Sequence, residues 1–250
     1  DSMVFLDDNP AERQIVRDTM PEVAVPEIDP VDVSSFIRVI EGAGYFEPMT
    51  ISEDDLKRHG TYMENKQRKD LENTMKSYDD FLASLSMVAE IGPFLPIYFD
   101  RIAQLTNKTN QFNLTTKRYT DADLKNMISA GSKIYCMSVS DKFGDSGITG
   151  CIIIKQDEVD SFLLSCRILG KGIENEFLKQ IITVLKQNRY TQLKASYIPT
   201  LKNMQVKNFY ENNGFTLVSE SDTGEKRYSL NMSSFNYVPN DIYTVSITEE

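Results

Sequence analysis

Residues 167–172, Arg167-Ile168-Leu169-Gly170-Lys171-Gly172, decide how the second half of this sequence folds, because they lie between a predicted strand and a predicted helix. The strand is expected at about residues 159–166, and the helix runs from Gly172 to Gln187 with apolar residues on one face. Glycines allow the backbone to approach a ligand closely, and the free N–H groups of a helix N-terminus attract anions. The pattern therefore predicts an anion-binding loop that would hold a phosphate or pyrophosphate through Arg167, Gly170, Lys171 and Gly172.

Two interpretations of this loop stay open. The first is the anion site, and the second is a glycine-rich turn without any ligand. Glu174 and Glu176 in the first turn of the helix count against a further anion there, although Lys171 offsets them.

Strands and helices alternate on both sides of the loop. The other elements expected in this half are strands at about residues 87–91, 133–140, 147–155 and 193–197, helices at 94–105, from 120 onward and at 202–212, and a closing hairpin of 215–219 with 227–230. This alternation predicts an α/β domain.

The beginning of the chain has a different pattern. Val4 to Leu6 is interpreted as a strand, Asn9-Pro10 as the start of a helix, and residues 22–26 as a second strand. This order predicts part of a parallel α/β sheet. Residues 52 to about 76 are very polar and predict a long solvated helix. We therefore expect domains at 1–50 and 86–250, joined by a helical connector at 51–85.

Charge and composition narrow the class of protein. The net charge is −10, and residues 1–60 contain 14 acidic against 5 basic side chains. An acidic surface argues against nucleic acid as the main partner. No apolar run reaches the length needed to cross a bilayer, so no membrane span is expected in this chain. Three cysteines and one histidine, His59, fit a reducing, cytoplasmic setting better than a disulfide framework or a zinc site.

Asp7 and Asp8 follow the first predicted strand directly. Two adjacent carboxylates at this edge of a sheet suit Mg²⁺, and the alternative is an acidic turn before a helix. The wider string, residues 5–13, resembles the last metal-binding motif of haloacid-dehalogenase-type (HAD) phosphatases. The resemblance implies the C-terminal part of a HAD-type Rossmann-like parallel sheet, with Asp7 and Asp8 as magnesium ligands. The Asp-x-Asp nucleophile motif of that family is expected upstream of this sequence, so phosphatase activity is not expected from this chain alone.

The loop at 167–172 resembles the Arg/Gln-x-x-Gly-x-Gly/Ala motif of GNAT acetyltransferases, and residues 203–215 resemble the helix that closes their fold. The resemblance implies a GNAT-like α/β domain with a mixed, mostly antiparallel sheet. It implies a CoA or phosphopantetheine site that includes Asn203, with Tyr210 protonating the departing thiolate. The alternative for Tyr210 is an aromatic side chain whose hydroxyl is satisfied by a neighbour.

The motifs together occur in an order that resembles FkbH-like proteins (HAD subfamily IIIC) over the whole 250 residues. The resemblance implies Mg²⁺-dependent phosphoryl chemistry on a phosphorylated small molecule of the phosphoglyceryl type in the full-length parent. It also implies acyl transfer to or from an acyl carrier protein or CoA.

Within that resemblance Cys166 could hold an acyl group as a thioester, since a helix N-terminus and Arg167 would favour the thiolate form. The alternative is a small buried strand cysteine. The asparagine-rich segment offers Asn107, Asn110 and Gln111 as hydrogen-bond partners for pantetheine, or as a polar loop that caps neighbouring helices.

Two other functions stay open. One is a plain GNAT-type acyltransferase that uses CoA, and the other is a non-catalytic module that docks a carrier protein or another partner. The sequence does not identify the acyl group, the carrier or the oligomeric state.

Overall fold

The computed structural model describes the backbone of residues 3–45 and 53–248, and the side chains of 3–45 and 63–248. His59 lies outside the residues whose side chains are described. The chain divides into two compact units, unit 1 (Asp1–Gly60) and unit 2 (Thr61–Glu250). The domain boundaries expected at residues 50 and 86 stay a prediction.

Unit 1 contains two helices, α1 (Pro10–Thr19) and α2 (Ser35–Gly42). The prediction of two regular strands, one on either side of α1, is wrong. The two segments form one isolated parallel bridge, Val4 with Ala24, in which the Phe5 N–H donates to the Ala24 carbonyl at 2.9 Å. Two paired segments seldom hold a regular sheet without further strands beside them, so the expected parallel α/β sheet is present here only as this bridge.

The described part of unit 1 has almost no apolar core. Its buried apolar side chains are those of Pro26 and Ile28, and α2 buries none of its residues. Ile15 and Ile37 are exposed. Because buried apolar area supplies most of the stability of a fold, unit 1 gains little stability from its own packing.

Unit 2 opens with the end of α3 (Glu53–Glu72), followed by α4 (Tyr78–Leu85). The predicted long polar helix is confirmed as a helix, but it is not solvated on all sides. Arg68 is buried and forms a bidentate ion pair with Asp141, with Nε–Oδ2 at 2.7 Å and Nη2–Oδ1 at 2.8 Å. The hydrogen bonds that Arg68 donates to Asp141 are the main reason that the pKa of Arg68 is raised.

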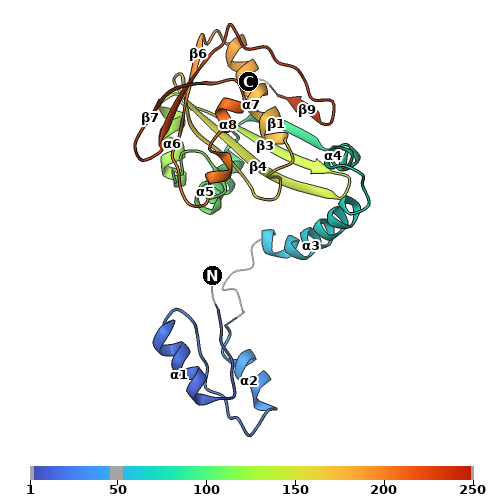
Figure 1. Cartoon of the computed structure of the whole chain (residues 1–250), viewed down its shortest axis with the longest axis vertical. Helices are drawn as coiled ribbons and strands as arrows, with labels where there is room; N and C mark the ends of the chain where they lie inside the picture. The colour runs from blue at the N-terminus through green and yellow to red at the C-terminus, as the bar shows by residue number, and fades with distance from the viewer. Residues whose placement is uncertain (1–2, 46–52, 249–250) are drawn as a thin grey trace. The chain divides into compact units, whose positions relative to one another are not determined.

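One mixed sheet of nine strands forms the centre of unit 2 as described (Figure 1). The strands are β1 (Val88–Pro93), β2 (Phe112–Asn113), β3 (Lys133–Asp141), β4 (Gly144–Lys155), β5 (Glu158–Leu164), β6 (Gln192–Tyr197), β7 (Thr216–Glu220), β8 (Lys226–Asn231) and β9 (Thr244–Ile247). Their order is β7-β8-β6-β5-β4-β3-β1-β9, and β2 pairs with β5. Only the β1–β9 and β5–β6 pairs are parallel. The predicted α/β class with a mixed, mostly antiparallel sheet is confirmed for unit 2.

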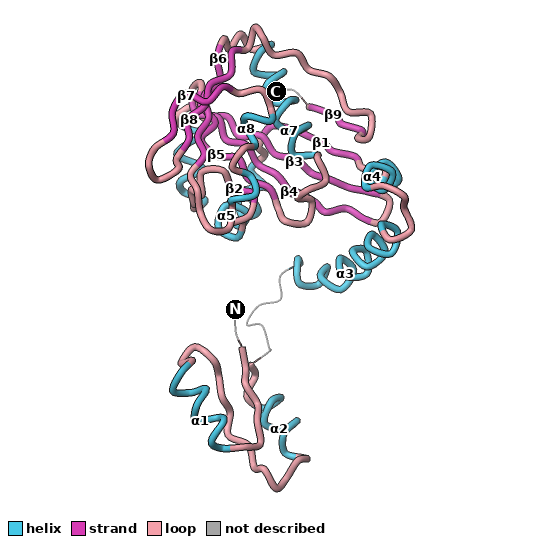
Figure 2. Tube along the Cα trace, in the orientation of Figure 1, coloured by secondary structure: helices cyan, strands magenta, loops and turns pink. Residues whose placement is uncertain are grey.

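Helices cover both faces of this sheet, as the cyan segments in Figure 2 show. The helices that follow α4 are η1 (Pro96–Tyr98), α5 (Phe99–Lys108), α6 (Asp121–Ser129), α7 (Ile173–Gln187), η2 (Met204–Val206) and α8 (Phe209–Asn212). Successive strand residues point to opposite faces. Ile152 and Ile154 accordingly pack in a large cluster with α4, α7 and α8, whereas Cys151 and Ile153 pack in a smaller one with α5 and α6.

Two parts of unit 2 differ from the sequence prediction. The helix expected at 202–212 is divided into the short elements η2 and α8, and Asn203, which precedes both, is held by hydrogen bonds outside any helix. Strand β9 has no counterpart in the prediction, since four half-exposed or exposed residues carry little hydrophobic signal.

Candidate functional site

The strands β5 and β6 are paired only through the first two residues of β5 and the middle of β6. Their parallel partners are Glu158 with Lys194 and Val159 with Ala195. Further along, β2 takes the place of β6 beside β5, and Leu114 connects the two sides. Its N–H donates to the Phe162 carbonyl at 3.1 Å, and its carbonyl accepts from the Ile198 N–H at 2.8 Å. The chain's own backbone therefore fills the place between the diverging strands.

Residues 165–172, which we call the glycine loop, connect the end of β5 to the start of α7, as the sequence predicts. Its two glycines have φ of 80° at Gly170 and 79° at Gly172, in the left-handed region that other L-residues seldom adopt. Gly172 is the N-cap of α7 and provides no side-chain cap. The first N–H groups of α7 are therefore left to other partners.

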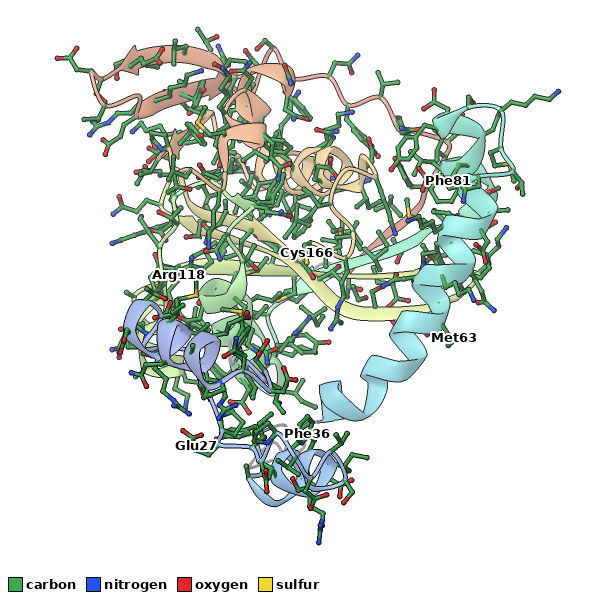
Figure 3. The ribbon with its side chains drawn as sticks, turned by 60° about the horizontal axis from the view of Figure 1, so that its bottom comes forward. Glu27, Phe36, Met63, Phe81, Arg118 and Cys166 are labelled. Atoms are coloured by element: carbon green, nitrogen blue, oxygen red, sulfur yellow. The ribbon has the colours of Figure 1, made fainter. Side chains whose placement is uncertain are left out.

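Cys166, labelled in Figure 3, lies in this loop just after β5. Its side chain is exposed. The other two cysteines, Cys136 and Cys151, are buried and face each other across β3 and β4. The interpretation of Cys166 as a buried strand cysteine is therefore wrong, and that interpretation holds for the other two. Arg167, the next residue, is exposed as well. The loop thus presents a thiol and a cation to solvent.

Lys171 is partly buried and makes no ion pair or hydrogen bond through its ammonium group within the described residues. Burial is the main reason that its pKa is lowered; the nearby Arg68 lowers it further, and Asp141 acts in the opposite direction. The ammonium therefore lies close to the buried Arg68–Asp141 pair, and an added anion would stabilise its charged form.

Two tyrosines that the sequence analysis missed cover the glycine loop. The Tyr78 hydroxyl donates to the Gly170 carbonyl at 3.2 Å, and the Tyr243 hydroxyl donates to the Lys171 carbonyl. A Cβ added at Gly172 would lie 2.6 Å from the Tyr243 hydroxyl oxygen. Burial raises the pKa of Tyr243 to about 12. Both tyrosines lie far from the loop in sequence, so no local pattern points to them.

Glu174 has its carboxylate beside the N-terminus of α7. Burial, the largest effect, raises the pKa of Glu174, and the backbone N–H groups of Glu174 and Gly172 lower it. Its Oε2 atom is buried and has no hydrogen-bond partner. The carboxylate is therefore an anion that already lies where the sequence predicts an external one.

Tyr210 lies deep in unit 2, 1% exposed, among Phe209, Phe215 and Tyr228. Its hydroxyl has no hydrogen-bond partner among the described residues, so the prediction of a neighbour that satisfies it is wrong. Burial raises the pKa of Tyr210. The hydroxyl consequently keeps its proton, as a proton donor must.

Asn203 uses its whole amide within the protein. Its Nδ2 donates to the carbonyls of Asn113 at 3.0 Å and Ile198 at 2.9 Å. Its Oδ1 accepts from the Thr200 N–H at 2.7 Å and from the Tyr197 hydroxyl at 3.1 Å. With no exposed surface, Asn203 holds the segment after β6 in place, and a cofactor contact by its side chain would require breaking these bonds.

The asparagine-rich segment acts mainly as a polar loop whose side chains bond to the backbone and to neighbouring residues. Asn107 donates to the carbonyls of Ala103 and Tyr119, and Asn110 accepts from Arg118 at 2.5 Å. Gln111 is exposed, and its side chain makes no hydrogen bond within the described residues. Of the three predicted ligand contacts, Gln111 alone has its amide free for a ligand.

The described surroundings of Asp7 and Asp8 do not complete a magnesium site. Oδ1 of Asp7 accepts from the Asn9 N–H at 2.8 Å, as in an ordinary turn before a helix. The Arg13 guanidinium donates to the main-chain carbonyls of both aspartates. Among the described residues no three His, Cys, Asp or Glu side chains lie close enough together to hold a metal ion. The contacts agree with the alternative of an acidic turn.

No family model matches this sequence, and no curated protein matches it. Solved structures of similar form include the ribosomal-protein-S18-alanine N-acetyltransferase of Escherichia coli, with a TM-score of 0.45, 11% identity, and coverage of 59% of this chain and 96% of that one. A GNAT-family acetyltransferase of Staphylococcus aureus Mu50 has a TM-score of 0.43 and 14% identity, and covers 58% and 99% of the two chains.

The spermidine N-acetyltransferase of Vibrio cholerae, in complex with CoA and spermine, has a TM-score of 0.44 and 12% identity, with coverage of 58% and 96%. These neighbours are acetyltransferases. Similarity at this level does not assign a family or an activity to the present chain. No helix in the described part of the chain is long and apolar enough to cross a membrane.

Proposed function

We propose that unit 2 transfers acyl groups carried as thioesters on a pantetheine-type thiol, and that Cys166 receives the acyl group. One observation carries the proposal: Cys166 is exposed in the loop that joins β5 to the N-terminus of α7, whereas the other two cysteines are buried. An exposed thiol that precedes a cation in the sequence, in a loop that leads into a helix, is available to act as a nucleophile.

The transfer step is a thioester exchange. The Cys166 thiolate attacks the carbonyl carbon of the incoming thioester, a new C–S bond forms at Cys166, and the bond to the pantetheine sulfur breaks. The departing thiolate takes a proton. Tyr210 is the proposed donor because its buried hydroxyl is protonated and unpartnered. Gln111, with its amide free, is a proposed hydrogen-bond partner of the pantetheine chain.

The resemblance to FkbH-like proteins extends this proposal to the full-length parent. There the acyl group would come from a phosphorylated small molecule and be passed to an acyl carrier protein. Any metal-dependent phosphoryl chemistry would belong to that parent, because the described surroundings of Asp7 and Asp8 do not complete a magnesium site. No step proposed for unit 2 uses the metal.

A transfer assay tests the proposal. The chain is mixed with an acyl-pantetheine or acyl-CoA donor and with either a thiol or an amine acceptor, and the acylated product is measured. Transfer to the thiol is expected in the wild type, to be lost in Cys166→Ser and to be slowed in Tyr210→Phe.

Two other results would favour the other functions. Transfer to the amine that is unchanged in Cys166→Ser would indicate a direct CoA-dependent acyltransferase. Donor binding without transfer in every variant would indicate a docking module.

A further inference from the structure

The N-terminus of α7 carries two glutamates in different states. Glu176 is buried but has partners: the Lys179 ammonium at 3.2 Å from Oε1, and the Tyr237 hydroxyl, which donates to Oε2 at 2.9 Å. Glu174 forms no ion pair with any described residue, and its Oε2 has no hydrogen-bond partner. Only the negative charge of Glu174 is therefore left without a cation at this helix end.

The surroundings of Glu174 do not compensate its charge. Lys171 precedes it in the loop, but the charges that act on the Lys171 ammonium are those of Arg68 and Asp141. After burial, which has the largest effect, the groups that raise the pKa of Tyr78 are Glu72 and Glu174. Glu174 therefore has no ion-pair partner among the described residues, although Arg167 and Lys171 belong to the same loop and Lys179 pairs with Glu176.

Tyr78 and Tyr243 fix the loop in this arrangement. Their hydroxyls donate to the carbonyls of Gly170 and Lys171, respectively. The two loop carbonyls are thereby held from α4 and from the segment before β9. A diphosphate that reached the α7 N–H groups would have to displace the Glu174 carboxylate.

We propose that Glu174 is a specificity-determining residue that excludes the diphosphate of CoA from the glycine loop and selects a thioester donor without one, such as pantetheine attached to a carrier protein. The inference rests on the proposed function, because it concerns the donor of that transfer. Two anions in one partly buried place repel each other strongly. A carrier-bound pantetheine has a single phosphodiester and no diphosphate to place at α7.

Calorimetric titration with CoA and with pantetheine, which has no phosphate, tests this selection. The wild type is expected to bind pantetheine at least as tightly as CoA. In Glu174→Gln the affinity for CoA is expected to rise about tenfold or more, while that for pantetheine changes less than about twofold. Asp222→Asn is the matched control, because it removes one exposed charge elsewhere in unit 2 and should leave both affinities unchanged.

The outcomes separate the two proposals. If the wild type binds both ligands and Glu174→Gln does not change their ratio, Glu174 has no role in selection, and the proposed function stands. If no variant binds either ligand, the proposed function fails and this inference with it. Should Glu174→Gln not fold, as judged by its thermal transition, Glu174→Ala removes the same charge and the same ratio decides.

Discussion

Two helix N-termini in this molecule follow an extended segment and a turn, and their environments differ. At α1, Asn9 provides an ordinary side-chain cap, with its Oδ1 accepting from the Ala11 N–H at 3.0 Å, in a unit with almost no core. At α7, a glycine without a cap begins a helix whose apolar face is fully buried. Adjacent acidic residues suggested a site at the first helix, but their contacts are those of a turn, whereas the loop before the second helix exposes a thiol and a cation.

The comparison shows that a sequence motif is stronger evidence for a ligand site when packing holds its residues in place. A ligand site needs groups that are held in place by packing but are not used by the fold. The turn at Asp7 and Asp8 meets neither condition, because its polar groups serve the local turn and Arg13. The loop before α7 meets both, because it is anchored to a large core and leaves a thiol and a cation exposed.

The largest expected difference is in the free energy of unfolding, between a core substitution in unit 2 and a surface substitution in unit 1. Phe177→Ala should lower the free energy of unfolding of unit 2 by about 3–5 kcal/mol, because it removes a fully buried ring that packs against Phe162 with centroids 5.6 Å apart. Ile37→Ala, on the exposed face of α2, should change stability by less than about 0.5 kcal/mol. Urea unfolding followed by circular dichroism measures both, and equal effects would contradict the assignment of the core to unit 2.

Loss of the ion pair between Arg68 in α3 and Asp141 at the end of β3 should have the next largest effect. Arg68→Ala leaves the Asp141 carboxylate buried without its partner, which should cost about 3 kcal/mol. Asp141→Ala is the reciprocal variant and should cost a similar amount. A loss below about 1 kcal/mol in both would mean that α3 is not anchored there.

The same pair predicts how stability depends on pH. Although burial acts to raise it, the pKa of Asp141 is lowered overall by hydrogen bonds from Arg68 and the Phe143 N–H. A group with a depressed folded-state pKa contributes stability above its ordinary pKa, and that contribution is lost as the pH falls through the depressed value. The wild type should therefore lose more stability on acidification than Arg68→Ala. Parallel acid titrations in the two proteins would refute the pairing.

Substitutions at the two helix caps should change the free energy of unfolding by smaller amounts. Gly172→Ala should cost about 1–2 kcal/mol, because a left-handed residue gains a Cβ beside the Tyr243 hydroxyl. Asn9→Ala should cost about 1 kcal/mol by removing the α1 cap. Amide hydrogen exchange in the first turn of each helix measures the loss locally. A neutral Gly172→Ala would show that the loop can rearrange freely.

Much of unit 2 could be predicted from the sequence, because strands such as β3, β4 and β5 contain continuous buried runs and the apolar face of α7 has a helical period. Strand β2, with two residues, and β9, with four, could not be predicted, since their pairing depends on distant partners. In unit 1 the strand prediction was wrong, because the residues have the propensity but lack neighbouring strands.

The site divides in the same way. The glycine loop, Cys166 and the acidic first turn of α7 could be found from local sequence, and the structure brings them together. Tyr78 and Tyr243 could not be found, because they reach the loop from elements that are distant in the chain. One internal partner of Asn203, the Asn113 carbonyl, is likewise distant in the chain, so this buried structural contact could not be read from a motif.

The smallest predicted difference is in the chemical labelling of the three cysteines. It bears directly on the proposed role of Cys166. A maleimide should label Cys166 rapidly in the folded protein and reach Cys136 and Cys151 only on unfolding, because only Cys166 is exposed. Peptide mapping after a short reaction gives the three extents. Equal labelling of all three cysteines would contradict the difference in exposure between Cys166 and the other two, but it would not contradict the assignment of the fold.

Acylation of Cys166 tests the account most directly. The chain is incubated with an acyl-pantetheine donor, and the intact mass is measured before and after hydroxylamine, which cleaves thioesters. The account predicts one added acyl group that hydroxylamine removes, that maps to Cys166, and that is absent from Cys166→Ser but present in Cys151→Ala. An acyl group that never forms on the wild type, or one that persists in Cys166→Ser, would contradict it.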